Sequence, residues 1–134
     1  MLPTFPEMLA QLVAEPSVSS TSPEIDRSNL RVIEHLANWL DGLGFRTEIM
    51  PLPGRPDKAN LIATLGGEIN DGMGGLVLAG HTDTVPFDEA LWQSDPFTIK
   101  DDPDRYYGLA SCGMKGFFTG ALEAGAPVAN EPLS

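Results

Sequence analysis

The sequence predicts an α/β fold in one domain, with two helices first, about three strands in the middle and a helix at the end. Two helical periodicities, over residues 5–13 and 30–43, precede one alternating stretch and two short apolar runs bounded by glycines. A chain of 134 residues, 42% of them apolar and 20% charged, is long enough for one hydrophobic core. We therefore expect a single ordered domain over residues 1–134.

The first helix is expected to begin at Thr4, because Glu7 follows three residues later in the capping-box pattern. Apolar side chains then recur at three- and four-residue spacing, at Phe5, Met8, Leu9, Leu12 and Val13. Glu15 precedes a proline, which disfavours the helical conformation and ends the helix. The serine-rich residues 17–22 are expected to form a loop.

The second helix is predicted over residues 30–43, where apolar side chains share one face. These are Leu30, Ile33, Leu36, Ala37, Leu40 and Leu43. Gly42 and Gly44 suit the end of a helix, where a left-handed residue is often needed. Apolar and polar residues then alternate over residues 45–50, as in a half-exposed strand.

Two further strands are predicted at residues 60–65 and 76–79, after a turn over residues 51–56. Both are almost wholly apolar, which is typical of strands with both faces covered. The glycine-rich residues 66–75 between them form a connector, since a phosphate loop would lie between a strand and a helix. Residues 86–105 are expected to be irregular, and residues 114–124 form the last helix.

Charge and cysteine content restrict the partners and the compartment. The formal net charge of −11 argues against nucleic acid and against anionic membranes, which attract clustered lysine and arginine. A single cysteine forms no internal disulfide, which suits a reducing compartment. The first residues lack the basic start of a signal peptide, and no apolar run approaches the roughly 20 residues that span a bilayer. We expect a cytoplasmic protein.

His81 is the first candidate functional residue, because it directly follows the third predicted strand. In open α/β sheets, ligands bind beyond the carboxyl ends of strands. A metal-binding histidine commonly donates its other ring N–H to a carboxylate, and Asp83 is placed to accept it. The alternative is a histidine satisfied by loop backbone, and position alone does not decide between them. His35, on the polar side of its helix, is expected to be solvated or half-packed and not a ligand.

Four stretches carry a family resemblance in the same order along the chain: PSVSSTSPEIDRSN, LANWLDGLGF, GHTDTVPFDEALWQSDPF, and Tyr107-Gly108 leading to MKGFF at 114–118. Together they resemble the acetylornithine deacetylase group of co-catalytic zinc hydrolases, which also includes succinyl-diaminopimelate desuccinylase, aminoacylase and glutamate carboxypeptidase. The residues at positions 84–87 (TVPF) and 116–118 (GFF) favour the acetylornithine branch. The resemblance implies the amino-terminal part of a mixed-sheet catalytic domain of the zinc peptidase type, without its lid and dimerisation domain.

The resemblance also implies a function and a site. The group uses two metal ions, zinc or cobalt, to hydrolyse N-acetyl-L-ornithine to L-ornithine and acetate in arginine biosynthesis. Its members act on small N-acyl amino acids and are homodimers. By the resemblance, His81 corresponds to a ligand of one metal ion, and Asp83 corresponds to the catalytic-site carboxylate that orients this histidine.

Two positions depart from the family pattern close to this site. Gly113 stands where the family has the aspartate that bridges both metal ions, and Ala110 stands where a glycine is usual. Without a shared carboxylate the two cations repel each other, so we expect weak or no metal binding in this chain. Cys112 is either a replacement thiolate ligand or a small buried residue, and we favour the buried residue because neighbouring side chains on an extended chain point to opposite sides.

The resemblance places the remaining metal ligands and the general base of the family after residue 134, so the sequence predicts that this chain is inactive alone. Two alternatives stay open. The chain is a non-catalytic remnant or binding module that keeps part of the fold, with open sheet edges available for association. Otherwise it is a fragment of a hydrolase for another N-acyl amino acid or a dipeptide.

Overall fold

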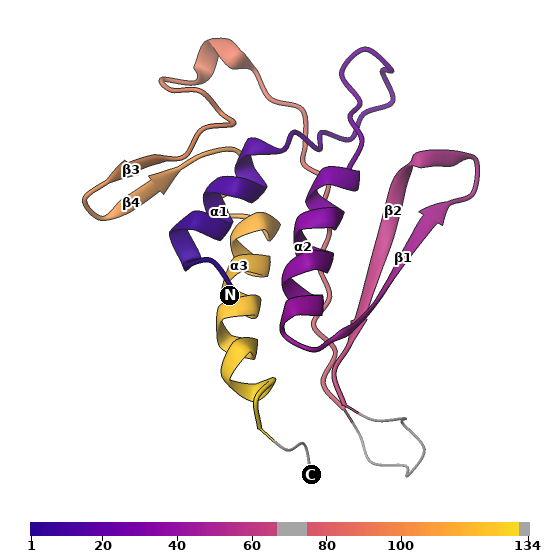
Figure 1. Cartoon of the computed structure of the whole chain (residues 1–134). Coiled ribbons are helices and arrows are strands. Elements are labelled where there is room, and N and C mark those ends of the chain that lie inside the picture. The colour runs from indigo at the N-terminus through magenta and orange to yellow at the C-terminus, as the bar shows by residue number, and fades with distance from the viewer. Residues whose placement is uncertain (67–74, 132–134) are drawn as a thin grey trace.

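A computed structural model of the chain describes residues 1–66 and 75–131 (Figure 1). The helices are α1 (Phe5–Ala14), α2 (Leu30–Gly42) and α3 (Met114–Val128), with a short 3-10 helix, η1 (Glu89–Leu91). The strands are β1 (Arg46–Leu52), β2 (Arg55–Thr64), β3 (Lys100–Asp102) and β4 (Arg105–Tyr107), paired as two antiparallel hairpins. The fold is therefore a mixture of helices and small antiparallel sheets, and the predicted α/β class is confirmed.

The start of α1 has the predicted cap. The Thr4 backbone N–H donates to Glu7 Oε2 at 2.8 Å, and the Thr4 hydroxyl donates to the same oxygen at 2.9 Å. The hydrogen bonds to Thr4 also lower the pKa of the Glu7 carboxyl. The helix ends before Glu15, which is extended with φ −95°. The capping box and the residue before proline therefore predict both ends of this helix correctly.

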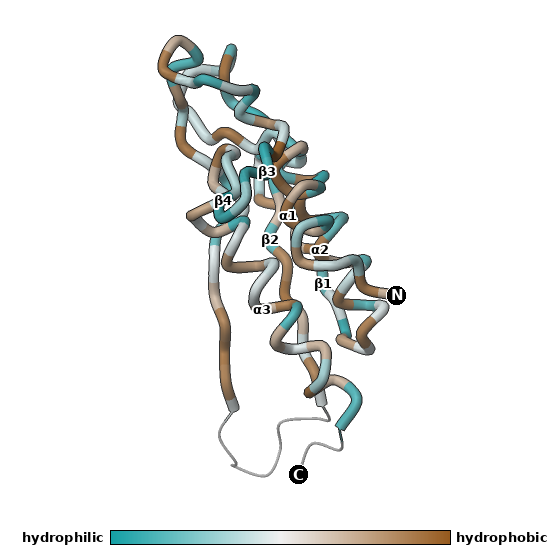
Figure 2. The backbone as a smooth tube through the Cα atoms, turned by 90° about the vertical axis from the view of Figure 1, so that its left-hand side faces the viewer, coloured by the Kyte–Doolittle hydropathy of each residue, from teal (hydrophilic) through white to brown (hydrophobic). Residues whose placement is uncertain are grey.

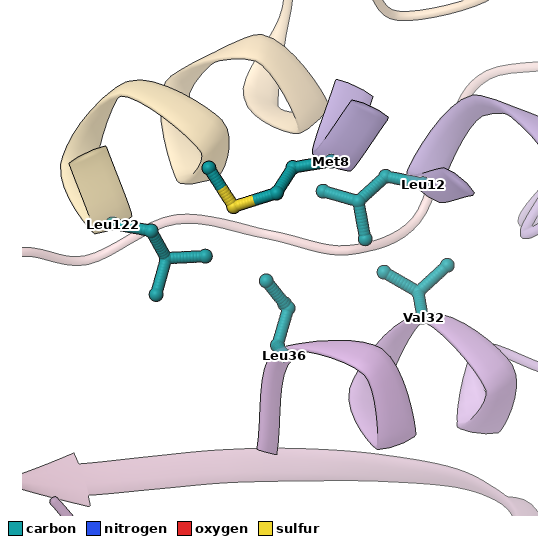
Figure 3. Close-up of a cluster of buried hydrophobic side chains, with 5 residues drawn as sticks. All are labelled: Met8, Leu12, Val32, Leu36 and Leu122. Atoms are coloured by element: carbon teal, nitrogen blue, oxygen red, sulfur yellow. The ribbon is translucent and has the colours of Figure 1, made fainter. Parts of the chain in front are cut away.

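The hydrophobic core lies between the three helices (Figure 3). Its buried members are Met8, Leu12, Val32, Leu36 and Leu122. Each is at most 5% exposed, and burial of such a side chain contributes about 1.5–3 kcal/mol to folding. Helices α1 and α3 pack against each other, while α2 also packs against β1 and β2. The core thus joins residues from both ends of the described chain.

The β1–β2 hairpin turns more tightly than the sequence suggests. The strands pair from Arg46↔Thr64 to Pro51↔Ala59, with an irregularity between Pro51 and Leu52. The reversal is limited to Pro53-Gly54, where Gly54 has φ +73°. The turn predicted over residues 51–56 is wrong at both ends, and β2 begins well before residue 60. A two-stranded ribbon accommodates prolines because each strand has an edge without ladder hydrogen bonds.

The third predicted strand, at residues 76–79, is absent. This segment has no regular secondary structure, and it pairs with no strand in the described part of the chain. Leu76, Val77 and Leu78 are 86%, 85% and 60% exposed. Ile62 in β2 is also 49% exposed, so the prediction of strands covered on both faces is wrong. Apolar character marks a segment that is suited to pairing, but it does not supply the partner strand.

The segment 86–105, expected to be irregular, contains η1 and the start of the β3–β4 hairpin. Asp101 and Asp102 pair with Tyr106 and Arg105 in that hairpin. The last helix, α3, is present and extends four residues beyond the predicted end, to Val128. The glycine-rich connector lies largely outside the described residues. Among the helices of residues 1–66 and 75–131, none is both long and apolar enough to cross a membrane.

Candidate functional site

A concavity of about 380 Å³ lies between the segment after residue 80 and the start of α3. Its wall is formed by His81, Asp83, Thr84, Val85, Leu109, Ala110, Gly113, Met114 and Lys115. The structure thus brings together the two predicted site residues and the two positions that depart from the family pattern. This concavity is the candidate functional site.

The His81 ring contacts the carboxylate of Asp83, two positions later in the chain. His81 Nδ1 lies 3.0 Å from Asp83 Oδ1 and 2.9 Å from the Asp83 backbone oxygen. Because both oxygens accept hydrogen bonds, Nδ1 is the protonated nitrogen of the neutral ring, and in that form Nε2 keeps a free lone pair. The side chains are 67% and 48% exposed. This geometry suits a metal ligand with an orienting carboxylate, and it also suits a histidine satisfied by its own loop.

The serine-rich loop anchors the segment that carries His81. The Ser17 hydroxyl donates to the Thr82 carbonyl at 2.7 Å, and the Thr84 N–H donates to the Ser17 carbonyl at 2.9 Å. The Ser19 N–H then donates to the Thr84 carbonyl at 2.8 Å, which forms a short parallel bridge between Val18 and Thr84. The composition of residues 17–22 predicts this loop, but no sequence pattern indicates its partner, which lies 65 residues away.

Asn29 connects the same segment to β2. Its Nδ2 donates to the Ala59 carbonyl and to Thr82 Oγ1, each at 2.8 Å, and its Oδ1 accepts the Ala59 N–H at 2.9 Å. Asn29 is 8% exposed, so its amide is a buried polar group with its hydrogen bonds made. By contrast, the buried hydroxyl of Thr84 has no partner among the described residues. The sequence did not single out Asn29.

The loop before Asn29 is held to β2 by charged side chains. Asp26 accepts hydrogen bonds from the Ser20 N–H at 2.9 Å, from Arg55 at 2.6 Å and from Lys58 at 3.1 Å. These contacts hold the pKa of the Asp26 carboxyl far below its usual range, with the Ser20 amide as the largest cause. Lys58 also donates to the Arg27 carbonyl. The network fixes the loop that anchors the site.

The opposite wall of the concavity is the turn that leads into α3. The Leu109 N–H donates to the Pro96 carbonyl at 2.7 Å, and the Gly113 N–H donates to the Ala110 carbonyl at 3.0 Å. Ala110 has φ +64°, the left-handed region that favours glycine. Gly113 is the residue that precedes α3, and a Cβ there would meet its nearest atoms, all in Ala110, at 3.6–3.8 Å. A Cβ at position 113 would therefore fit in ordinary van der Waals contact.

Lys115 lies at the base of this wall. It is 1% exposed, and its Nζ donates to the Glu15 carbonyl at 2.8 Å, at the carboxyl end of α1. A cation is favoured there, because the last carbonyls of a helix carry partial negative charge. Burial nevertheless lowers the pKa of the Lys115 amine to about 8, and the Glu15 carboxylate opposes the shift. From the sequence, this lysine has no predicted role beyond its place in the family pattern.

Two other candidates are placed outside the concavity. Cys112 is exposed, so its predicted burial is wrong. It belongs to the turn before α3, where the chain lies at the surface, and such exposure depends on the path of the turn. His35 is half-packed, as predicted, with Nε2 3.3 Å from Glu15 Oε1 and its ring 5.4 Å from the ring of Trp39.

The donor set of the concavity does not fit a two-metal centre. Across residues 1–66 and 75–131, no three histidine, cysteine, aspartate or glutamate side chains come together in a group that could hold a metal ion. A catalytic zinc ion usually takes about three protein ligands, whereas the concavity offers His81 and Asp83. Gly113, in the same lining, supplies no side-chain donor atom. No chemical step through a metal ion follows from these residues alone.

Comparisons with known proteins agree with the sequence resemblance. Peptidase family M20/M25/M40 matches residues 77–133. The chain is 53% identical over 123 residues to the acetylornithine deacetylase of Pasteurella multocida (strain Pm70) and 52% identical to that of Proteus mirabilis (strain HI4320). Each match covers 92% of this chain and 31% of the relative, so the chain spans about a third of the length of these enzymes. The resemblance stated from the sequence is therefore confirmed: this chain is similar to acetylornithine deacetylases over about a third of their length.

Proposed function

We propose that this chain contributes part of the catalytic domain of a cytoplasmic, metal-dependent hydrolase. The reaction is conversion of N-acetyl-L-ornithine to L-ornithine and acetate in arginine biosynthesis, and residues 1–134 do not catalyse it alone. The 53% identity to an acetylornithine deacetylase supports the choice of reaction. The claim that these residues do not catalyse the reaction alone rests on the concavity, whose lining combines His81 and Asp83 with a glycine at position 113.

We assign His81 the role of a zinc or cobalt ligand and Asp83 the role of the carboxylate that orients its ring. The short Nδ1–Oδ1 distance of 3.0 Å supports this assignment, because it directs the free Nε2 lone pair away from Asp83. Gly113 limits the ability of these two residues to take part in binding a pair of metal ions. Two cations held close together repel each other unless a shared anion lies between them, and a glycine supplies no anion.

A chimeric enzyme tests the proposal directly. Residues 1–134 of this chain would replace the matching segment of the Pasteurella multocida enzyme, and zinc content and N-acetylornithine hydrolysis would be measured. We expect the chimera to be inactive and poor in zinc, and the chimera with Gly113→Asp to recover both. The isolated chain is expected to stay inactive with or without that change.

The matched control is His81→Ala in the Gly113→Asp chimera, which should lose zinc and activity again. An unsubstituted chimera that hydrolyses N-acetylornithine as fast as the parent enzyme would refute the role of Gly113. Turnover of another N-acyl amino acid or of a dipeptide, without turnover of N-acetylornithine, would refute the substrate.

A second candidate function is that of a non-catalytic binding module. The exposed apolar residues 76–78 favour it, because monomeric proteins seldom leave such a run uncovered. Sedimentation and urea unfolding of the isolated chain distinguish the two functions. A monodisperse chain with one cooperative transition supports a binding module, whereas aggregation supports a part that requires the rest of the enzyme.

A further inference from the structure

Strand β2 holds the amide of Asn29 in a single orientation. The Ala59 N–H donates to Asn29 Oδ1 at 2.9 Å, and Asn29 Nδ2 donates to the Ala59 carbonyl at 2.8 Å. Because Ala59 presents one donor and one acceptor, only one placement of the amide oxygen and nitrogen satisfies both. The second N–H of Nδ2 donates to Thr82 Oγ1, 2.8 Å away. Asn29 therefore offers Thr82 a hydrogen-bond donor in a fixed place.

Thr82 lies between His81 and Asp83 in the chain and is anchored at two of its atoms. Its hydroxyl accepts the hydrogen bond from Asn29, which is 8% exposed, and its carbonyl accepts a hydrogen bond of 2.7 Å from Ser17, which is fully buried. Loss of either bond would leave a buried polar group unpaired, which folded proteins seldom tolerate. The chain between the two members of the pair is therefore held through both a side chain and a carbonyl.

The His81–Asp83 pair receives little restraint from its other surroundings. The two side chains are 67% and 48% exposed, and a contact between exposed ionisable groups contributes little by itself. Residues 76–78, shortly before the pair, are each at least 60% exposed, and Figure 2 shows this brown length of chain at the left, apart from β1 and β2. Gly80 adds one close contact, with Met114 in α3. The pair therefore takes its geometry mainly from the backbone between its two members.

We propose that Asn29 is a positioning residue of the candidate site, which acts through Thr82 to hold the His81–Asp83 pair. The contact that it preserves is the one of 3.0 Å from His81 Nδ1 to Asp83 Oδ1, which keeps the proton of the neutral ring on Nδ1 and leaves Nε2 free. Asn29 makes its hydrogen bonds to Ala59 and Thr82, so it acts on the ring only indirectly. The use of the Nε2 lone pair in hydrolysis rests on the proposed function.

Three substitutions separate positioning from general stability. Thr82→Val removes the hydrogen bond from Asn29 with little change in shape and keeps both bonds between Asn29 and Ala59, whereas Thr82→Ser keeps the hydroxyl. Ser28→Ala is the matched control, because Ser28 Oγ donates to the Asp57 carbonyl at 2.7 Å and ties the same loop to β2 through a bond that does not involve Thr82. We expect Thr82→Val and Ser28→Ala both to lower the urea midpoint, since each removes a hydrogen bond.

The deciding measurement is the tautomer ratio of His81, from nitrogen NMR of the imidazole rings in the full chain at alkaline pH, where the rings are neutral. Thr82→Val should lower the ratio of the Nδ1–H form to the Nε2–H form about two- to tenfold, which corresponds to the loss of one ordinary hydrogen bond. Thr82→Ser and Ser28→Ala should leave the ratio unchanged, and His35, the other histidine, is the internal reference. An unchanged ratio in Thr82→Val would overturn the proposal by showing that Ser17 suffices. An equal shift in Ser28→Ala would overturn it by reducing the effect to stability.

The same substitutions in the chimera with Gly113→Asp are compared by the transfer of zinc to a chelator, and this measurement decides the proposal if the isolated variants aggregate. Thr82→Val should weaken zinc binding about tenfold, whereas Thr82→Ser and Ser28→Ala should not. A tautomer ratio that Thr82→Val lowers, together with a Gly113→Asp chimera that does not hydrolyse N-acetylornithine, refutes only the proposed function. An active chimera in which Thr82→Val changes neither the tautomer ratio of the chain nor the zinc affinity refutes only this inference.

Discussion

Ala110 holds a backbone conformation that costs an L-amino acid about 1–2 kcal/mol, with φ +64°. Ala110→Gly should therefore stabilise the chain by about 1 kcal/mol, after allowance for the greater freedom of glycine in the unfolded state. Urea unfolding measures the change. Ala124→Gly, at an exposed position inside α3, is the control and should destabilise by about 1 kcal/mol. Equal signs for the two variants would contradict the role of the positive φ.

The lowered pKa of Lys115 predicts that its contribution to the free energy of unfolding rises at alkaline pH. Burial lowers its pKa from 10.5 to about 8 in the folded chain, so between these values the unfolded chain binds more protons than the folded one. The contribution of Lys115 to the free energy of unfolding should therefore increase from pH 8 to pH 10.5. Urea unfolding across this range measures it. Lys115→Met should lose the slope, and a variant that keeps the slope would assign it to another group.

Residues that act within a few positions of each other were predictable, and those that act over long separations were not. The approach of His81 to Asp83 follows from a spacing of two residues. The contacts of Asn29 join it to Ala59 and Thr82, 30 and 53 residues away. No periodicity or composition signals such a pairing. The exposure of Cys112 was mispredicted for the same reason, because it depends on the path of a whole turn.

At the scale of elements, two glycines of α3 have opposite roles. A Cβ at Gly116 would collide with the Ser111 carbonyl oxygen, which belongs to the turn that forms the site. A Cβ at Gly120 would meet nothing within 4 Å. Gly116→Ala should destabilise by about 2 kcal/mol or more, whereas Gly120→Ala should stabilise by about 1 kcal/mol. Thermal unfolding of both variants tests this contrast, and stabilisation by both would show that the turn moves freely.

The three helices were predictable because helix caps and apolar periodicity depend on residues that are close together in the sequence. Thr4 and Glu7 are one example, and the apolar face of α2 is another. Strands differ, since a strand requires a partner at its edge. Residues 60–65 acquired one in β1, whereas residues 76–79 have the same apolar character and no partner among the described residues. The β3–β4 hairpin was missed because its short strands are polar and largely exposed.

At the scale of the whole molecule, Asp26 links acid stability to the integrity of the site. Its pKa lies far below the usual 3.8 in the folded chain, so its favourable contribution is present at neutral pH and is lost as the pH falls below about 4. The free energy of unfolding should decrease in this range. Asp26→Asn should lower the urea midpoint at pH 7 and flatten the acid dependence. Asp41→Asn, at an exposed position in α2, should leave that dependence in place.

The hydrogen bond from Lys115 to the Glu15 carbonyl joins residues 100 positions apart. During synthesis, the partner of α1 therefore leaves the ribosome only after nearly the whole described chain has been made. Until then, the apolar face of α1 has only α2 and the hairpin to contact. The nascent chain is thus exposed to aggregation until α3 has been made, because the core between the three helices closes only then.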